Sequence, residues 1–428
     1  MCDSVVVARP GEPVWLAKNS DREPDEPQLV EVVAAAEHPP GAILRGTSAT
    51  LPQVRRTRAM IVSRPAWMAG IEMGVNERGV AVANQAVWTR VPVAPRGLTS
   101  MDLQRLALER SDTAADAVEV VLDLLARFPQ GGRMALGDPK FQYHGAMILA
   151  DPAEAWILET AGEFWALQRV RGVRSISNAL TIRGDFDRVH PGAYAYARSR
   201  GLCRSALGFD FAAAFASPTI GALAGARARR RCSAGLAGIL QQSERLGLPG
   251  LALVLRDHDG ATPAAGLRMR MPCAHASYLP TRTHGQTTGS MIARLAEGSP
   301  ARVWLTGTSS PCLSIFKPAS LDLPAGVIGP APTTRADGES LWWQHDGSTG
   351  RRSSTTRPAR PRSPTRGRSS RPGRPRSTGD VAAVAEIWEA HRQALPGWAE
   401  LASAVGRPGR RPFARWWAHK AKSAAATS

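Results

Sequence analysis

The chain has 428 residues, of which 43% are hydrophobic, a fraction typical of a globular protein. This length holds one large core or two domains. No apolar run approaches the roughly 20 residues that a membrane-spanning helix needs. The N-terminus carries an acidic residue at position 3 and breaks at Pro10, so no secretory signal is visible. We therefore expect a globular protein that does not act at a membrane.

The formal net charge of +18 is concentrated in one segment. Ten arginines and no acidic residue lie within residues 347–379, which leaves about +8 for the rest of the chain. An Arg-rich segment can bind nucleic acid through phosphate contacts. This one holds a single alanine as its only hydrophobic residue, so it cannot bury apolar surface. We expect residues 346–379 to be a disordered linker or the product of a compensated frameshift, and we disfavour a nucleic-acid partner.

Helix-like sequence resumes at residue 380, so the segment separates two parts of the chain. The predicted organisation is a main domain over residues 1–345, the Arg/Ser/Pro-rich stretch over 346–379, and a helical segment over 380–428. The oligomeric state is left open, and a homo-oligomer is compatible with the sequence.

The cysteines are scattered along the chain. They are Cys2, Cys203, Cys232, Cys273 and Cys312. With no close pair, this pattern disfavours a disulfide scaffold and zinc ligation, and it favours a reducing cytoplasm. His275 and His284 near Cys273 suggest a metal, but no carboxylate or further histidine follows at ligand spacing. We interpret both as structural histidines, assign no role to residues 257–259 (Asp-His-Asp), and expect no metal and no cofactor.

In chain order, the first predicted element is a hairpin. Residues 4–8 and 14–17 are short strand-like runs, and the RPGEP sequence at 9–13 is a typical turn. With the turn centred on Gly11, residue 2 pairs near residue 20. The hairpin therefore brings Lys18 and Asp21 close to Cys2.

Cys2 becomes a nucleophile and a base in one residue if Met1 is removed. The free α-amino group, with a pKa near about 8, can accept a proton from the thiol. Lys18 would hold the thiolate as its anion, and Asp21 would orient the amine. The structural alternative is a polar strand end at the surface.

The remaining predicted elements alternate between strand pairs and helix pairs. They are a hairpin at 69–75 and 80–87, helices at 102–110 and 113–128 with residues 111–112 as a cap between them, an antiparallel meander over 146–177, mostly helix over 209–256, and a hairpin at 286–295 and 302–306 around Gly298. This alternation indicates two sheets enclosed by helices. It disfavours a parallel dinucleotide-binding sheet, and no phosphate-binding glycine motif is present.

Several ordered sequence blocks share one resemblance. The blocks are CDS at 2–4, KNSDRE at 18–23, MGVNERGVA at 73–81, WILETAG at 156–162, SISNAL at 175–180, QTTGSM at 286–291, TGT at 306–308 with PC at 311–312, and LWW at 341–343. Together they resemble the secernin/dipeptidase family of N-terminal-nucleophile cysteine hydrolases, and more distantly penicillin V acylase and bile-salt hydrolase. The resemblance implies an α+β fold, a four-layer αββα sandwich of two antiparallel sheets in which Cys2 attacks amide carbonyls.

Amide hydrolysis also needs a group that stabilises the oxyanion. Asn178, just after a predicted strand, is the first candidate, in agreement with the resemblance; its structural alternative is a turn cap. Asn84, on the returning strand of the second hairpin, is the second candidate. Arg22 would bind a substrate carboxylate or form a surface ion pair.

These observations lead to one function with two alternatives. The predicted function is hydrolysis of dipeptide amide bonds by Cys2, and the partner is a small peptide or amide substrate. The alternatives are an acylase of non-peptide amides and a non-catalytic, secernin-like interaction protein.

Overall fold

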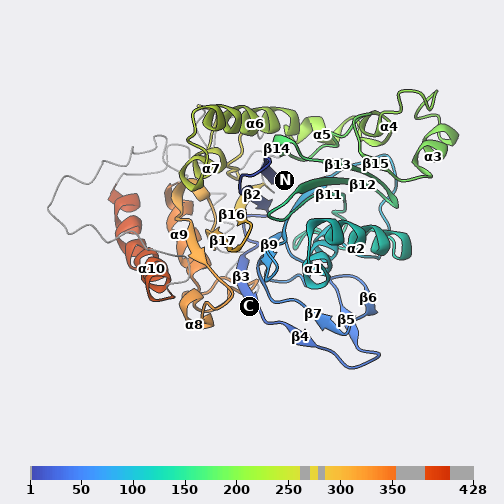
Figure 1. Ribbon diagram of the computed structural model, residues 1–428. Coiled ribbons are helices and arrows are strands. Elements are labelled where there is room, and N and C mark those ends of the chain that lie inside the picture. Colours follow the sequence, from blue (N-terminus) through green and yellow to red (C-terminus); the bar gives the residue numbers. More distant parts are fainter. Residues whose placement is uncertain (1, 261–269, 278–284, 353–380, 405–428) are drawn as a thin grey trace.

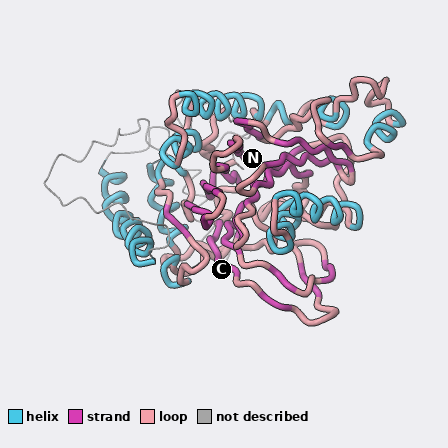
Figure 2. The backbone as a smooth tube through the Cα atoms, in the orientation of Figure 1, coloured by secondary structure: helices cyan, strands magenta, loops and turns pink. Residues whose placement is uncertain are grey.

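Two antiparallel sheets form the centre of the protein, with helices along both sides (Figures 1 and 2). The computed structural model describes residues 2–260, 270–277, 285–352 and 381–404. Sheet A has the strand order β14 (Gly172–Ile176), β1 (Cys2–Ala8), β2 (Val14–Arg22), β16 (Gln286–Ala296), β17 (Ser299–Leu305) and β18 (Lys317–Ala319). Sheet B has the order β15 (Arg188–Val189), β13 (Phe164–Arg169), β12 (Ala155–Ala161), β11 (His144–Ala150), β10 (Ala81–Val87), β9 (Met73–Asn76), β8 (Met60–Pro65) and β3 (Gln28–Val33).

Side chains alternate between the two faces of each sheet, and each face packs into a different hydrophobic core. Val6 and Leu16 of sheet A pack with Ile148 of sheet B, so the two sheets face each other. Val5 points the other way and packs against α6 (Ala226–Gln242) and α7 (Leu248–Leu255). Val82 of sheet B packs against α1 (Ser100–Arg110) and α2 (Ala114–Arg127). The four layers of the predicted αββα sandwich are confirmed.

The two helices on sheet B begin at matching caps. Thr99 and Asp102 form a capping box at the start of α1, and Thr113 and Asp116 form one at the start of α2. The predicted cap at residues 111–112 is therefore one residue off, because Ser111 ends α1 and Thr113 begins α2. Both helices otherwise lie where the sequence pattern predicts them.

The N-terminal hairpin has the register that the turn position predicts. Cys2 pairs with Ser20 and Ser4 with Lys18, and Gly11 turns the chain at a φ of 73°. The second and third hairpins, β9–β10 and β16–β17, also form, the third around Gly298. These local pairings give the site its framework.

The predicted meander is wrong at its last strand. Strands β11, β12 and β13 pair in succession in sheet B, but β14 pairs with β1 in sheet A, where Ser4 faces Ile176. Gly172, at a φ of 87°, begins β14 in the left-handed region that favours glycine. This change of sheet matters for function because it carries Asn178 to the start of β1.

The helices that follow sheet A in the chain cover its β18 edge. α9 (Leu341–Arg352) and α10 (Val381–Ala404) pack together, and the buried Trp388 of α10 donates its indole N–H to the Pro318 carbonyl of β18 at 3.0 Å. α9 thus continues past residue 345. Most of the Arg-rich stretch, residues 353–380, lies outside the described residues.

Short elements complete the chain. They are β4 (Ala36–Glu37), β5 (Ile43–Arg45), β6 (Thr50–Pro52), β7 (Arg56–Thr57), α3 (Ala193–Ser199), α4 (Phe211–Phe215), α5 (Ile220–Leu223), η2 (Pro311–Leu313) and α8 (Ala325–Ile328). Of the helices in the described part of the chain, none combines the length and apolarity required to cross a membrane.

Candidate active site

Cys2 is the first residue of β1, and its main chain is held on both sides. The Cys2 N–H donates to Asn178 Oδ1 at 2.8 Å. Its carbonyl accepts from Ser177 Oγ at 3.2 Å and from Arg229 Nη1 at 3.3 Å. The residue is 4% exposed. The first turn after β14 and the helix α6 thus fix the position of the thiol.

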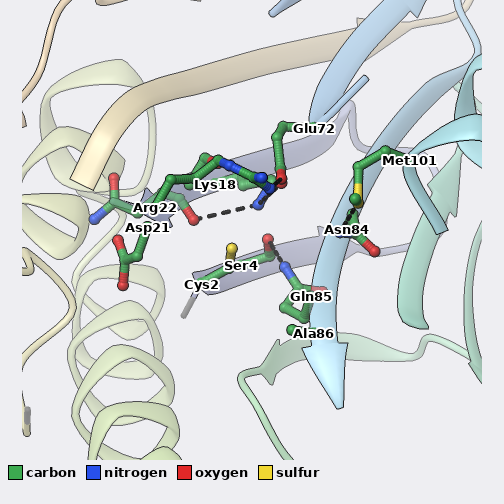
Figure 3. A network of polar contacts seen from close by, with 12 residues as sticks. Cys2, Ser4, Lys18, Asp21, Arg22, Glu72, Asn84, Gln85, Ala86 and Met101 are labelled. Carbon is green, nitrogen blue, oxygen red and sulfur yellow. Dashed lines mark hydrogen bonds and ion pairs between the residues drawn. The ribbon is translucent and has the colours of Figure 1, made fainter. Parts of the chain in front are cut away.

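Lys18 is the cation that lies beside the Cys2 side chain. Its ammonium lies 3.3 Å from Glu72 Oε2 and donates to the Asn19 carbonyl at 3.3 Å. Burial alone would lower the pKa of Lys18, but the negative charges of Cys2 and Glu72 outweigh it and raise that pKa. Figure 3 shows Lys18 and Glu72 together beside Cys2. A permanently charged ammonium at this point stabilises a thiolate.

Asp21 lies near the end of β2 and belongs to the same polar group as Lys18. Its Oδ1 accepts from Thr287 Oγ1 at 2.7 Å, and its Oδ2 lies 3.5 Å from Arg229 Nη1. Burial raises the pKa of Asp21, although Arg229 acts in the opposite direction. The hairpin register therefore brings Cys2, Lys18 and Asp21 together as the sequence predicts.

Arg229 of α6 is the central residue that sequence reasoning missed. Its guanidinium contacts Asp3, Asp21 and Asn178 Oδ1, and its side chain is fully buried. The neighbouring Arg227 and Arg231 are exposed, so the run at 226–231 looks like a solvated face. The feature of the sequence that distinguishes Arg229 from its neighbours is helical spacing. It shares one buried helix face with Ala226, Ser233, Ala237 and Leu240.

Asn178 binds the Cys2 nitrogen and has one further N–H group with which it can donate a hydrogen bond. Its Oδ1 accepts from Cys2 N–H and from Arg229, while its Nδ2 donates to the Ala86 carbonyl at 2.8 Å. An amide NH₂ has two hydrogens. The second has no partner among the residues that the structure describes, so this side chain can donate to a substrate oxygen while it orients Cys2.

Asn84 points away from Cys2. On β10, Gln85 faces sheet A and reaches Ser4, whereas Asn84 lies on the opposite side of the strand, beside Met101 of α1 (Figure 3). The Asn84 Nδ2 donates to Met101 Sδ at 3.3 Å. The structure therefore brings Asn178, and not Asn84, into contact with Cys2.

Arg22 is part of a buried ion-pair network. Its Nη1 lies 2.7 Å from Glu72 and its Nη2 lies 2.6 Å from Glu26, and Nη2 also donates to the Met134 carbonyl at 2.7 Å. The alternative of a surface ion pair is wrong, because all three side chains are buried. Through Glu72, Arg22 supports the position of Lys18.

Solved structures similar to this chain include proteins that are distant from it in sequence. No known family model matches the sequence. Similar solved structures include a conjugated bile acid hydrolase from Clostridium perfringens, at 12% identity and a TM-score of 0.42 over 71% of this chain and 88% of that one. Penicillin V acylase from Agrobacterium tumefaciens follows at 13% identity and a TM-score of 0.39, over 71% and 85% of the two chains. An N-acylethanolamine-hydrolyzing acid amidase ortholog from Caenorhabditis elegans has 11% identity and a TM-score of 0.26, over 42% and 71%.

The first two of these matches are the kinds of protein that the sequence blocks resemble at a distance. At TM-scores below 0.5, such likenesses carry no argument about the activity of this chain. The function is therefore inferred from the contacts of Cys2 and its neighbours.

Proposed function

We propose that this chain hydrolyses amide bonds with Cys2 as the nucleophile, once removal of Met1 has freed its α-amino group. One observation carries the proposal: the Cys2 nitrogen donates to Asn178 Oδ1 at 2.8 Å while Lys18 lies beside the Cys2 side chain (Figure 3). In the structure this nitrogen is the amide that removal of Met1 would turn into the α-amine, so both reacting groups have a neighbouring partner. This arrangement suits a nucleophile that supplies its own base.

The first half-reaction forms a thioester. The Cys2 sulfur attacks the substrate carbonyl carbon, and the thiol proton passes to the Cys2 α-amine. The C=O electron pair moves to oxygen, which becomes an oxyanion. When that intermediate collapses, the C–N bond breaks, and the α-ammonium returns the proton to the leaving nitrogen.

The second half-reaction regenerates the enzyme. Water attacks the thioester carbon and gives a proton to the α-amine. The C–S bond then breaks, the sulfur recovers the proton, and the carboxylic acid leaves. The same base acts in both halves, so no distant histidine is required.

The neighbouring side chains have separate roles in this scheme. Asn178 Oδ1, which accepts from the Cys2 amide N–H in the structure, would accept from the freed amine and leave its lone pair available, while the second Nδ2 hydrogen stabilises the oxyanion. Lys18 stabilises the thiolate. Arg229 balances the charges of Asp3 and Asp21, and Asp21 supports the α-ammonium.

Dipeptides are the proposed substrates, supported by the sequence resemblance alone. Arg22 does not enter the proposal as a carboxylate-binding residue, because its Nη groups already bind Glu26 and Glu72. We assign it the positioning of Glu72 and, through it, of Lys18.

The test starts with the intact mass of the purified protein, which should lack Met1. A panel of dipeptides and N-acyl amides is then assayed with wild type, Cys2→Ala, Cys2→Ser and the control Cys203→Ser, whose thiol lies outside the site. We expect Cys2→Ala to lose at least about 10³-fold in turnover and to keep its circular dichroism spectrum, and Cys203→Ser to retain activity.

The panel also separates the alternatives. Turnover of N-acyl amides without dipeptides would favour an acylase. No turnover of either class by a correctly processed, folded protein would favour a non-catalytic role. Undiminished turnover in Cys2→Ala, or retention of Met1 in an active protein, would overturn the mechanism.

A further inference from the structure

A second group of reactive side chains lies apart from Cys2. It comprises His258, Cys273, His275 and Cys312, which we call the Cys–His cluster. His258 follows α7, Cys273 and His275 lie in the segment 271–277, and Cys312 belongs to η2. The proposed mechanism uses none of them. Sequence spacing missed the group because its members come from three separate segments.

The four donor atoms of the cluster lie close together. His275 Nε2 is 3.2 Å from His258 Nε2, 3.4 Å from Cys273 Sγ and 3.3 Å from Cys312 Sγ. All four donor atoms lie within 4.8 Å of one another. Zinc at its usual distances of about 2.3 Å from sulfur and 2.0–2.1 Å from nitrogen would separate tetrahedral ligands by about 3.4–3.8 Å. The donor atoms thus lie near this spacing, and shifts of up to about 1 Å would admit the ion.

Four lone-pair donors meet at this point. His275 Nε2 lies within hydrogen-bond distance of His258 Nε2, Cys273 Sγ and Cys312 Sγ. Hydrogen bonds can link these groups, and a metal ion placed between the four atoms would take one lone pair from each.

The backbone around the cluster is already fixed. Asn19 Nδ2 donates to the Leu255 carbonyl at 2.8 Å and to the Pro272 carbonyl at 2.9 Å, which joins two of the three segments. Arg256 Nε donates to the Pro311 carbonyl at 2.9 Å and joins the third. Because these bonds hold the main chain, the donors need little ordering when an ion binds.

The chemistry of the donors selects the metal. Two thiols and two imidazoles are soft to borderline ligands that suit zinc, and no carboxylate belongs to the cluster, as magnesium or calcium would require. We propose that His258, Cys273, His275 and Cys312 bind one Zn²⁺ ion as a closed structural site. Four protein ligands leave no open position, so the ion ties three segments together and takes no part in amide hydrolysis.

The experiment measures metal directly and does not depend on activity. The full chain is purified under reducing conditions without chelator, and its zinc is determined by inductively coupled plasma mass spectrometry. We expect about one zinc per chain. Replacement by Co²⁺ should give the intense visible absorption of a tetrahedral site and a thiolate-to-cobalt charge-transfer band.

Variants locate the site. Cys312→Ser should lose most of its zinc and the charge-transfer intensity. Cys232→Ser should keep both, because Cys232 bonds Asp257 and lies outside the cluster. If Cys312→Ser does not fold, the cobalt spectrum of wild type still decides the question. A folded, reduced wild type without zinc and without a tetrahedral cobalt spectrum would overturn the proposal, as would a native Cys273–Cys312 disulfide found by mass spectrometry.

Discussion

Cys2 and the Cys–His cluster are two cysteine centres with opposite surroundings. Charged groups surround Cys2: Lys18 lies beside its side chain (Figure 3), and Arg229 and Asp21 lie around its main chain. The cluster surrounds Cys273 and Cys312 with two imidazoles and the other thiol, and no carboxylate belongs to it. Cations favour a reactive thiolate, whereas a second thiol and two imidazoles favour a metal. In this protein, the neighbours of a cysteine decide its chemistry.

One residue joins the two centres. Thr287 Oγ1 donates to Asp21 and accepts from the N–H of Ala274, which lies between Cys273 and His275. The Thr287 N–H in turn donates to the Ala274 carbonyl. The segment that carries two cluster ligands is therefore two hydrogen bonds, through the single residue Thr287, from the acid beside Cys2.

The largest expected effect comes from removing the guanidinium of Arg229 from the Cys2 centre. Arg229→Met leaves the buried Asp3 and Asp21 without their counter-ion, and breaking a buried pair in this way costs about 3–5 kcal/mol. Urea denaturation at pH 7 should show this loss in the free energy of unfolding.

The conservative variant Arg229→Lys is the control, and it should recover part of that stability through its charge. An Arg229→Met variant as stable as wild type would mean that Asp3 and Asp21 need no counter-ion, and the contrast between the two cysteine centres would fail.

The next effect distinguishes the two asparagines. Removing one oxyanion donor typically costs about 10²–10³ in kcat. Asn178→Ala should show a loss of this size, because Asn178 contacts Cys2, whereas Asn84→Ala should change kcat less than about fivefold, because Asn84 contacts Met101. Steady-state kinetics on the best substrate of the panel measures both. The reverse order would assign the oxyanion to Asn84.

A smaller effect tests the connection between the centres. Thr287→Val removes the hydroxyl that bonds both Asp21 and Ala274, and a buried group left without its partner costs about 1–3 kcal/mol. We expect this loss in urea denaturation, together with weaker zinc retention against a chelator. Thr287→Ser keeps the hydroxyl and should behave like wild type. Zinc retention unchanged in Thr287→Val would make the two centres independent.

The smallest effect, measured per pH unit, is a pH dependence of stability at Asp3. Burial raises the pKa of Asp3 from an ordinary value of 3.8 to about 7, although Arg229 opposes it. Between pH 4 and 7 the folded protein therefore binds this proton more tightly than the unfolded chain does. The free energy of unfolding should fall as the pH rises through this range, by at most about 1.4 kcal/mol per pH unit.

The variant Asp3→Asn isolates that contribution. Asp346, whose pKa burial also raises to about 7, adds a slope of the same sign in both proteins, so the comparison is between slopes. Equal slopes for wild type and Asp3→Asn would show that Asp3 does not titrate in this range.

The sequence predicts the Cys2 centre better than the cluster because the two are assembled over different distances. The hairpin that places Lys18 and Asp21 is local, and its turn alone sets the register of Cys2 against Ser20. Asn178 required the resemblance as well, since only the move of β14 into sheet A brings it to Cys2. No local pattern reports that move.

Side chains buried by tertiary packing were the harder part. Arg229 sits in a run of arginines, and only the helical spacing of its buried neighbours distinguishes it. The cluster draws His258 and Cys312 from segments more than 50 residues apart, and spacing rules for metal ligands do not cover such distances. The ion pairs of Arg22 with Glu26 and Glu72 likewise depend on how β2 meets sheet B.

The packing of α10 on β18 has a consequence for how molecules meet one another. β18 is the last strand of sheet A, and an uncovered edge strand is a template for pairing with another chain. Trp388 covers this edge and binds the Pro318 carbonyl, and His391 Nδ1 lies 2.9 Å from the buried Lys317 Nζ. The helix α10 therefore prevents β18 from pairing with a strand of another molecule. A protein cut between residues 353 and 380 that lost this helix would expose the edge and precipitate.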